Sequence, residues 1–160
     1  MDQEQLAQAR NFIYTDIQRE LTIAEVSEKA PDILKQAGIH LGGGNFLCAL
    51  ALFCYIEFAG KLKFNNKKKD GSDYASKNFN DFFDALGESY KSFKDGFLDK
   101  NFVYDTFRCG LAHEYYIKHN CTVYMFGDTK FSGVGKTNKG DYYVVVKTLF
   151  EDFKVAFDKL

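Results

Sequence analysis

The chain has 160 residues and a formal net charge of −1, and 46% of its residues are hydrophobic. This length suffices for one domain with a buried core, and the hydrophobic content excludes an intrinsically disordered chain. The near-zero net charge argues against a protein that holds nucleic acid through bulk positive charge, but it leaves room for a local site. Seventeen Phe and ten Tyr, with no Trp, predict a core built largely from aromatic rings.

The start of the chain, MDQEQLAQAR, is polar and lacks the apolar segment of a signal peptide. The longest apolar run, residues 46–56, is shorter than the roughly 20 residues that span a bilayer. We therefore expect a cytoplasmic protein with no membrane partner. The chain has four cysteines, Cys48, Cys54, Cys109 and Cys121. In the cytoplasm they are expected to be free thiols, and their spacing matches no metal-binding motif.

The first half of the chain predicts three helices. Apolar residues recur every three or four positions over residues 2–29, which indicates one long amphipathic helix. Pro31 favours the first turn of a short helix over residues 31–37. Gly42–Gly44 predict a close-packed turn rather than a phosphate-binding loop, because no strand precedes them and no lysine follows closely. Asn45 is then expected to cap a helix over residues 45–59 that is apolar nearly all round and has Glu57 as its one charge.

Residues 60–76 predict a lysine-rich loop, in which Lys67–Lys69 form either a solvated run or a local basic patch. Helical periodicity returns over residues 78–94 and over about residues 101–116. Two segments rich in β-branched and aromatic residues, 121–126 and 141–146, predict a β-hairpin with a long loop. Residues 147–160 predict a closing helix. The fold class is therefore mainly α, with a bundle of four to five helices and a small β-hairpin (about residues 121–146) before the C-terminal helix, in one domain over residues 1–160.

The loop of this hairpin contains GVGKT at residues 133–137, which is similar to the end of a P-loop. A P-loop with this ending would have a glycine at position 130 and a strand that leads into a helix. This chain has Lys130 at that position. The segment leads towards a strand instead, so a hairpin loop is the better interpretation.

The segment FRCGLAHEYYIK, residues 107–118, holds the candidates for chemistry. Arg108 is one of only three arginines, and His113, one of three histidines, follows five residues later. Arginine offers a charged planar fork to phosphate oxygens, and histidine can donate or accept a proton near neutral pH. A purely structural interpretation is also open, in which Arg108 pairs with Asp105 and His113 bonds a backbone carbonyl.

This motif resembles the signature of HEPN proteins, an Arg followed by four to six residues and a His on a helix of the bundle. The segment GGGNFLCALALFCYIEFAGKL, residues 42–62, also looks like the central helix of a bacterial HEPN-like subgroup, and the resemblance covers roughly residues 1–120. It implies a four- or five-helix bundle and a metal-independent ribonuclease with no cofactor, in a toxin–antitoxin or defence role. It further implies catalytic roles for Arg108 and His113, a homodimer that joins two such motifs, and RNA and an antitoxin-like protein as partners.

An α-helix turns about 100° per residue, so Arg108 and His113 are expected about 140° apart and should not meet within one chain. Small residues between them, Cys109 and Ala112, would let a partner helix approach, so a second chain would complete the site. Supporting roles are weakly assigned to Asn45, Cys109, Tyr115 and Tyr116. Active HEPN proteins often carry a polar residue where this chain has Cys109. This departure keeps open a non-catalytic module that binds nucleic acid, nucleotide or a protein, and also a purely structural or interaction protein.

Overall fold

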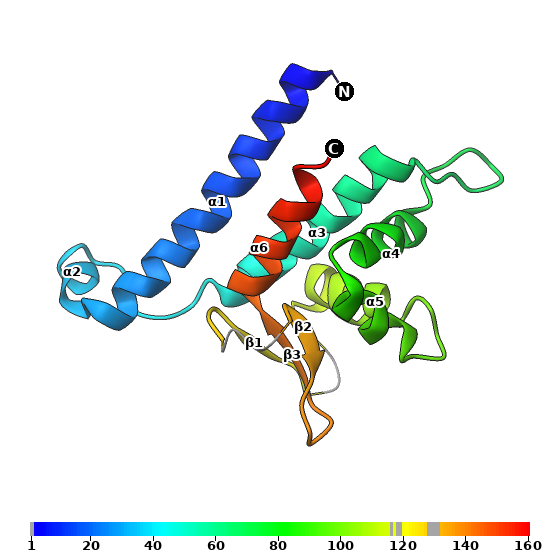
Figure 1. Cartoon of the computed structure of the whole chain (residues 1–160). Coiled ribbons are helices and arrows are strands. Elements are labelled where there is room, and N and C mark those ends of the chain that lie inside the picture. Colours follow the sequence, from blue (N-terminus) through cyan, green and yellow to red (C-terminus); the bar gives the residue numbers. More distant parts are fainter. Residues whose placement is uncertain (1, 116, 118–119, 128–131) are drawn as a thin grey trace.

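The computed structural model describes residues 2–115, 117, 120–127 and 132–160. Its elements in chain order are the helices α1 (Gln3–Lys29), α2 (Pro31–Gln36), α3 (Asn45–Phe64), α4 (Ala75–Ala85) and α5 (Glu88–Asp95), the π-helix η1 (Tyr104–Glu114), the strands β1 (Thr122–Tyr124), β2 (Val134–Lys136) and β3 (Tyr142–Val145), and the helix α6 (Val146–Phe157). The fold is therefore mainly α with a small sheet before the C-terminal helix, as the sequence predicts (Figure 1).

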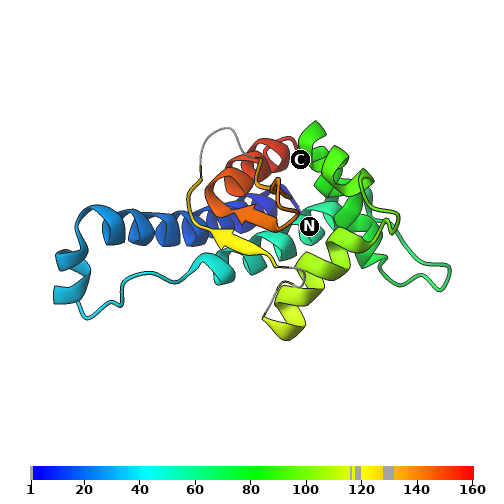
Figure 2. The same ribbon diagram turned by 90° about the horizontal axis from the view of Figure 1, so that it is seen from below.

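The long helix α1 and the short helix α2 confirm the first two predicted helices. Asp2 caps α1 by accepting a hydrogen bond from the backbone N–H of Gln5, and the Gln5 side chain accepts one from Asp2 in return. Three α1 residues enter the core: Ile13, Ile17 and Leu21. The rest of α1 runs on beyond the body of the molecule and carries α2 at its far end, so the two form a projecting arm (Figures 1 and 2).

Helix α3 is the central helix and packs against α1, α4, α6 and η1. It runs to Phe64, beyond the predicted end at Ala59. Asn45 does not cap it, because Gly44 occupies the N-cap position and the Asn45 side-chain amide donates to the carbonyl oxygen of Val123 at 2.7 Å. By length and composition α3 could also cross a membrane, but its packing is that of a bundle core helix.

The turn before α3 is correctly placed, but it is close-packed only at Gly44, where an added Cβ would lie 3.2 Å from Oε2 of Glu20. Gly42 and Gly43 both have positive φ angles, and a Cβ on either would meet nothing within 4 Å. The turn therefore needs glycine there for its backbone conformation, which side chains disfavour, rather than for space.

The predicted helix over residues 78–94 is two helices. Gly87, with φ 144°, separates α4 from α5. Helix α4 packs closely on α3: a Cβ on Gly60 of α3 would lie only 1.9 Å from the carbonyl oxygen of Asn78. This close approach brings the aromatic side chains of α4 into the centre of the core.

The predicted hairpin between residues 121–126 and 141–146 is wrong in its pairing. The sheet has the order β1-β3-β2, and β1 runs parallel to β3, with Val123 opposite Val144. The antiparallel partner of β3 is β2, which comes from the expected loop and places Gly135 opposite Tyr143. The local pattern identified the outer strands, but it could not reveal that a glycine-containing stretch would fill the position beside β3.

Strand β2 also accounts for the glycines of GVGKT. The ring and hydroxyl of Tyr143 lie where side chains on Gly135 would be, with the hydroxyl oxygen 2.2 Å from an added Cβ. A Cβ added to Gly133 would likewise lie only 2.4 Å from the Tyr90 hydroxyl oxygen. Both glycines are therefore required by packing within the sheet region, consistent with the interpretation that this segment is not a P-loop.

The core confirms the prediction that aromatic rings build it. The largest fully buried side chains include Tyr90 and eight phenylalanines: Phe53, Phe79, Phe82, Phe83, Phe107, Phe150, Phe153 and Phe157. They come from α3, α4, α5, η1 and α6, and several contact one another in stacked, tilted or edge-to-face arrangements. The four cysteines are free thiols.

Candidate functional site

Arg108 lies on η1 where this helix packs against α3. Its Nε atom is 2.7 Å from Oε2 of Glu57, and the centre of its guanidinium lies 5.8 Å from the centroid of the Tyr104 ring. The neighbouring contact between the Phe53 and Phe107 rings, 5.8 Å between centroids, holds the two helices together. Arg108 is therefore bound by a carboxylate from the central helix.

The Arg108–Glu57 contact is an ion pair at the edge of the core. The two side chains are 21% and 23% exposed, and the contacting Nε and Oε2 atoms are shielded from solvent. Their distance is that of a tight pair, but their directions do not form an aligned hydrogen bond. No ion pair between Arg108 and Asp105 is found among the described residues, so the structural interpretation has the wrong partner.

The outer end of the Arg108 guanidinium is open. Its Nη1 and Nη2 groups donate to no residue that the structure describes, and neither is among the shielded atoms without a partner. Arginine has five N–H donors in a flat fork, and paired donors of this kind match two oxygens of a phosphate. The arrangement thus anchors one edge of the guanidinium and leaves the other edge free for an anion.

The groups around Arg108 favour its charged form, and burial keeps the nearby phenol and thiol protonated. Burial lowers the pKa of Arg108, but Glu57 and Tyr104 outweigh this effect and the net change is upwards. Burial, with a further contribution from Glu57, raises the pKa of Tyr104 to about 12. Burial also raises the pKa of the Cys54 thiol, against a smaller opposing effect of Arg108. At neutral pH the Arg108 guanidinium is therefore charged, while Tyr104 is a neutral phenol and Cys54 a neutral thiol.

His113 is exposed near the end of η1, and its relation to Arg108 differs from the expectation. The prediction of about 140° between the two residues assumed an α-helix, whereas Tyr104–Glu114 is a π-helix. In a π-helix the N–H of residue i+5 bonds the carbonyl of residue i. Residues five apart, such as Arg108 and His113, therefore lie about one turn apart on the same face.

This geometry also changes the role expected for the small residues. A π-helix has more residues per turn than an α-helix, so Ala112 and His113 both lie about one turn after Arg108. Cys109 and Ala112 therefore do not lie between Arg108 and His113 on the helix surface. Ala112 is exposed and Cys109 is half-buried. The π-helix accordingly places Arg108 and His113 on one face of η1.

The supporting residues have different positions. Asn45 uses its side-chain amide to bond Val123, which ties α3 to β1 and makes its role structural. Tyr115 follows directly after η1 in a left-handed conformation, with φ 51°, and its exposed ring lies 6.0 Å from the Phe46 ring. Tyr115 is therefore available beside His113 for stacking. Tyr116 lies outside the described residues.

The lysine-rich loop between α3 and α4 carries less free charge than its sequence suggests. Lys61 and Lys67 both pair with Asp73. These two lysines hold the pKa of Asp73 at about 2. Part of the positive charge in the loop is therefore neutralised within the chain, which favours the solvated-loop interpretation.

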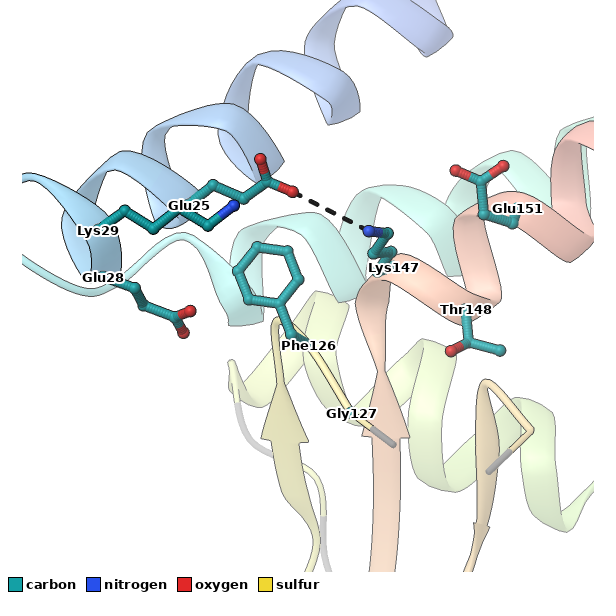
Figure 3. A pocket seen from close by; sticks show the side chains of 8 residues that line it. All are labelled: Glu25, Glu28, Lys29, Phe126, Gly127, Lys147, Thr148 and Glu151. Atoms are coloured by element: carbon teal, nitrogen blue, oxygen red, sulfur yellow. Dashed lines mark ion pairs between the residues drawn. The ribbon is translucent and has the colours of Figure 1, made fainter. Parts of the chain in front are cut away.

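A pocket of about 450 Å³ lies elsewhere, between α1 and the start of α6 (Figure 3). It is lined by Glu25, Glu28, Lys29, Phe126, Gly127, Lys147, Thr148 and Glu151. Lys147 already lies over the Phe126 ring, 5.8 Å from its centroid, and its Nζ atom is 3.9 Å from a Glu25 oxygen. None of the predicted site residues lines this pocket, and Lys147 is already paired with Glu25.

In the described part of the chain, no three His, Cys, Asp or Glu side chains converge closely enough to hold a metal ion. Comparison with protein-family models, curated proteins and solved structures finds no match for this chain.

Sequence reasoning missed Glu57 and Tyr104 as members of the site. A signal for Glu57 is present in the sequence, since it is the only charged residue between Asn45 and Gly60 on a helix that is apolar all round. A charge in such a place requires a partner, because an unpaired buried charge is costly. With three arginines in the chain, Arg108 was a natural candidate for that partner.

Proposed function

We propose that the chain is a HEPN-like protein that cleaves RNA without a metal ion, in the cytoplasm and in a toxin or defence role. The observation that carries this proposal is the arrangement on η1. Arg108 is anchored by Glu57 with its Nη groups open, and the exposed His113 lies about one turn further on the same face. A phosphate held by Arg108 would then lie within reach of an imidazole.

Metal-independent cleavage of RNA uses the 2′-hydroxyl next to the scissile phosphate as the nucleophile. A base takes the 2′-hydroxyl proton, the 2′-oxygen attacks phosphorus, and the 5′-oxygen leaves with a proton from an acid. The products are a 2′,3′-cyclic phosphate and a 5′-hydroxyl. Histidine can serve as base or acid, and the guanidinium stabilises the charge that develops on the phosphate oxygens.

Two proton transfers require two groups, and His113 is the one histidine that the described residues place on this face. A homodimer that brings two copies of η1 together would supply both. The proposal therefore includes a homodimer, with RNA as substrate and an antitoxin-like protein as a regulatory partner.

The test is cleavage of single-stranded and structured RNA with EDTA present. We expect products with 2′,3′-cyclic ends from the wild type and loss of these products in Arg108→Ala and His113→Ala. His40→Ala is the matched control, because His40 is an exposed histidine in the loop before α3 and should leave cleavage unchanged. Equal cleavage by wild type and His113→Ala would exclude the proposed site.

A second candidate function is a non-catalytic HEPN-like module that binds nucleic acid, nucleotide or a protein. The observation that favours it is the ion pair itself: Glu57 offsets the charge of Arg108, and Cys109 stands beside it in place of a polar residue. RNA binding that depends on Arg108, without cleavage by any variant, would support this alternative.

A further inference from the structure

Glu57 is a charged residue in a segment that otherwise has none. It lies on the central helix α3, one turn after the half-buried Cys54, and its Oε2 atom is shielded from solvent. A shielded carboxylate lowers stability unless an opposite charge compensates it, and apolar residues of similar volume often serve the core equally well or better. Packing alone therefore does not account for a glutamate here.

The part of Arg108 that Glu57 contacts indicates what Glu57 does. Glu57 contacts the Nε edge of Arg108, which is the edge nearest the main chain, and the Tyr104 ring lies against the guanidinium plane. A guanidinium that is held at Nε and against a ring has lost most of its freedom to rotate. The Nη1 and Nη2 groups, unlike Nε, are not among the shielded atoms without a partner, and they donate to no residue that the structure describes.

We propose that Glu57 is a positioning residue for the reaction: it fixes Arg108 so that the Nη fork meets the scissile phosphodiester group. This inference rests on the proposed ribonuclease function and adds a residue to it. Glu57 acts through Arg108 and does not touch the RNA. A preorganised donor stabilises developing charge without having to reorient during the reaction, so the effect should fall on kcat more than on KM.

A competing role for Glu57 makes the opposite prediction. If Glu57 only neutralised Arg108, its removal would strengthen RNA binding and raise cleavage, because the phosphate would no longer compete with a carboxylate. If Glu57 positions Arg108, its removal leaves the charge but lets the fork move, and cleavage falls. Small displacements of this kind can reduce rates by as much as about 100-fold.

The experiment measures kcat and KM for RNA cleavage in Glu57→Gln, Glu57→Asp and Arg108→Lys. We expect kcat in Glu57→Gln to fall by about 10- to 100-fold with little change in KM, and Glu57→Asp to recover part of the loss. Arg108→Lys should lose activity both alone and combined with Glu57→Gln, because an ammonium group has no planar fork. Glu28→Gln, at an exposed glutamate of α1, is the matched control and should behave as wild type.

Two further measurements separate positioning from folding. Thermal unfolding of each variant shows whether it is folded at the assay temperature, and only folded variants are compared. The double variant Glu57→Gln/Arg108→Ala should be no less active than Arg108→Ala alone, since Glu57 acts only through Arg108. Additive losses in the double variant, unchanged kcat in Glu57→Gln, or a rise in kcat would each overturn the inference while leaving the ribonuclease function in place. A wild-type chain that neither binds nor cleaves RNA would overturn both.

Discussion

Gly60 is the residue at which the packing of α3 on α4 leaves no space for a single methyl group. An added Cβ would lie 1.9 Å from the carbonyl oxygen and 2.6 Å from the carbonyl carbon of Asn78. These are backbone atoms of the neighbouring helix, so no rotation of a side chain can relieve the overlap. The helices must separate if the residue at this position is larger than glycine.

We therefore expect Gly60→Ala to lower the free energy of unfolding by about 1–3 kcal/mol, the usual cost of overpacking. This loss should occur even though alanine favours a helix interior over glycine by about 1 kcal/mol. Urea denaturation measures the change. Gly96→Ala is the control, since the nearest atom to its Cβ would be 3.3 Å away, and it should have a much smaller effect. Equal stability of Gly60→Ala and wild type would contradict the close approach.

For the residues of the Arg108 site, the sequence predicted two of the groups and missed their partner. Arg108 and His113 stand out in the sequence because both residue types are scarce and their spacing is short. Glu57 is about fifty positions away along the chain, and only the packing of α3 on η1 brings it to Arg108. Local spacing thus indicated the two candidate groups, whereas their electrostatic partner depended on a tertiary contact.

At the scale of elements, periodicity predicted where helices lie better than what kind they are. The predicted helices over residues 2–29 and 31–37 match α1 and α2 closely. The helix predicted over residues 101–116 is present as η1, but its hydrogen bonds follow the π pattern. Apolar spacing is compatible with both patterns over a few turns, because it records which residues are buried and not which carbonyl each N–H bonds. The angle between Arg108 and His113 depended on that choice.

The sequence pattern also could not predict which strands pair, because it records burial and not hydrogen bonding. The patterns of residues 121–126 and 141–146 indicate strands, but both parallel and antiparallel partners satisfy them. Here β1 pairs in parallel with β3, and β2 takes the antiparallel side. Glycines made the β2 segment resemble a loop, although Tyr143 lies directly over Gly135 and occupies the space that a side chain would take.

A hydrogen-bonded network joins α5, the start of β2 and α6. The Tyr90 hydroxyl donates to Oδ2 of Asp152 at 2.5 Å and accepts from the backbone N–H of Gly133 at 3.0 Å. Burial raises the pKa of Asp152, the hydrogen bond from Tyr90 partly opposes this, and Glu151 adds a smaller increase. The net pKa of Asp152 is higher in the folded chain than the ordinary value.

This direction fixes the sign of a pH effect. The folded chain binds the Asp152 proton more tightly than the unfolded chain does. Protonated Asp152 therefore contributes its full stability below about pH 3.9, and this contribution is lost as the pH rises through the pKa of Asp152 in the folded chain. We expect the unfolding free energy of Asp152→Asn, relative to wild type, to improve as the pH is raised from this value towards neutrality. Denaturation curves at a series of pH values measure this difference, and a constant difference would contradict it. Glu4→Gln, at an exposed position of α1, is the control and should show no comparable trend.

At the scale of the whole molecule, the chain exposes more surface than its mass requires. Its accessible surface is 9270 Å² for 18.3 kDa. A compact monomer of that mass exposes about 8,100 Å², so the excess is about 1,100 Å². The projecting arm of α1 and α2 is the visible source of this excess (Figure 2). A standard interface buries about 800 Å² on each partner, so the excess is large enough for a stable dimer.

Apolar side chains are exposed at the end of the bundle where η1 finishes and α3 begins. Leu47, Tyr115 and Tyr124 are all exposed there, and the contacts of Phe46 with Tyr115 and of Asn45 with Val123 bring their elements together. In the segment between α2 and α3, Ile39 and Leu41 are also exposed. Exposed apolar groups that gather in one region commonly mark an interface, and this region adjoins His113.

The proposed dimer can therefore be tested together with the proposed reaction. We expect light scattering after size exclusion to give a homodimer for the wild type and a monomer for Leu47→Glu, because a carboxylate at this surface would lose its water on association. Leu98→Glu is the control, since Leu98 is exposed in the segment between α5 and η1, and it should remain a dimer. If two copies supply the acid and the base, monomeric Leu47→Glu should also lose RNA cleavage while keeping its thermal stability. A monomeric wild type with full activity would remove the need for a second chain in the reaction.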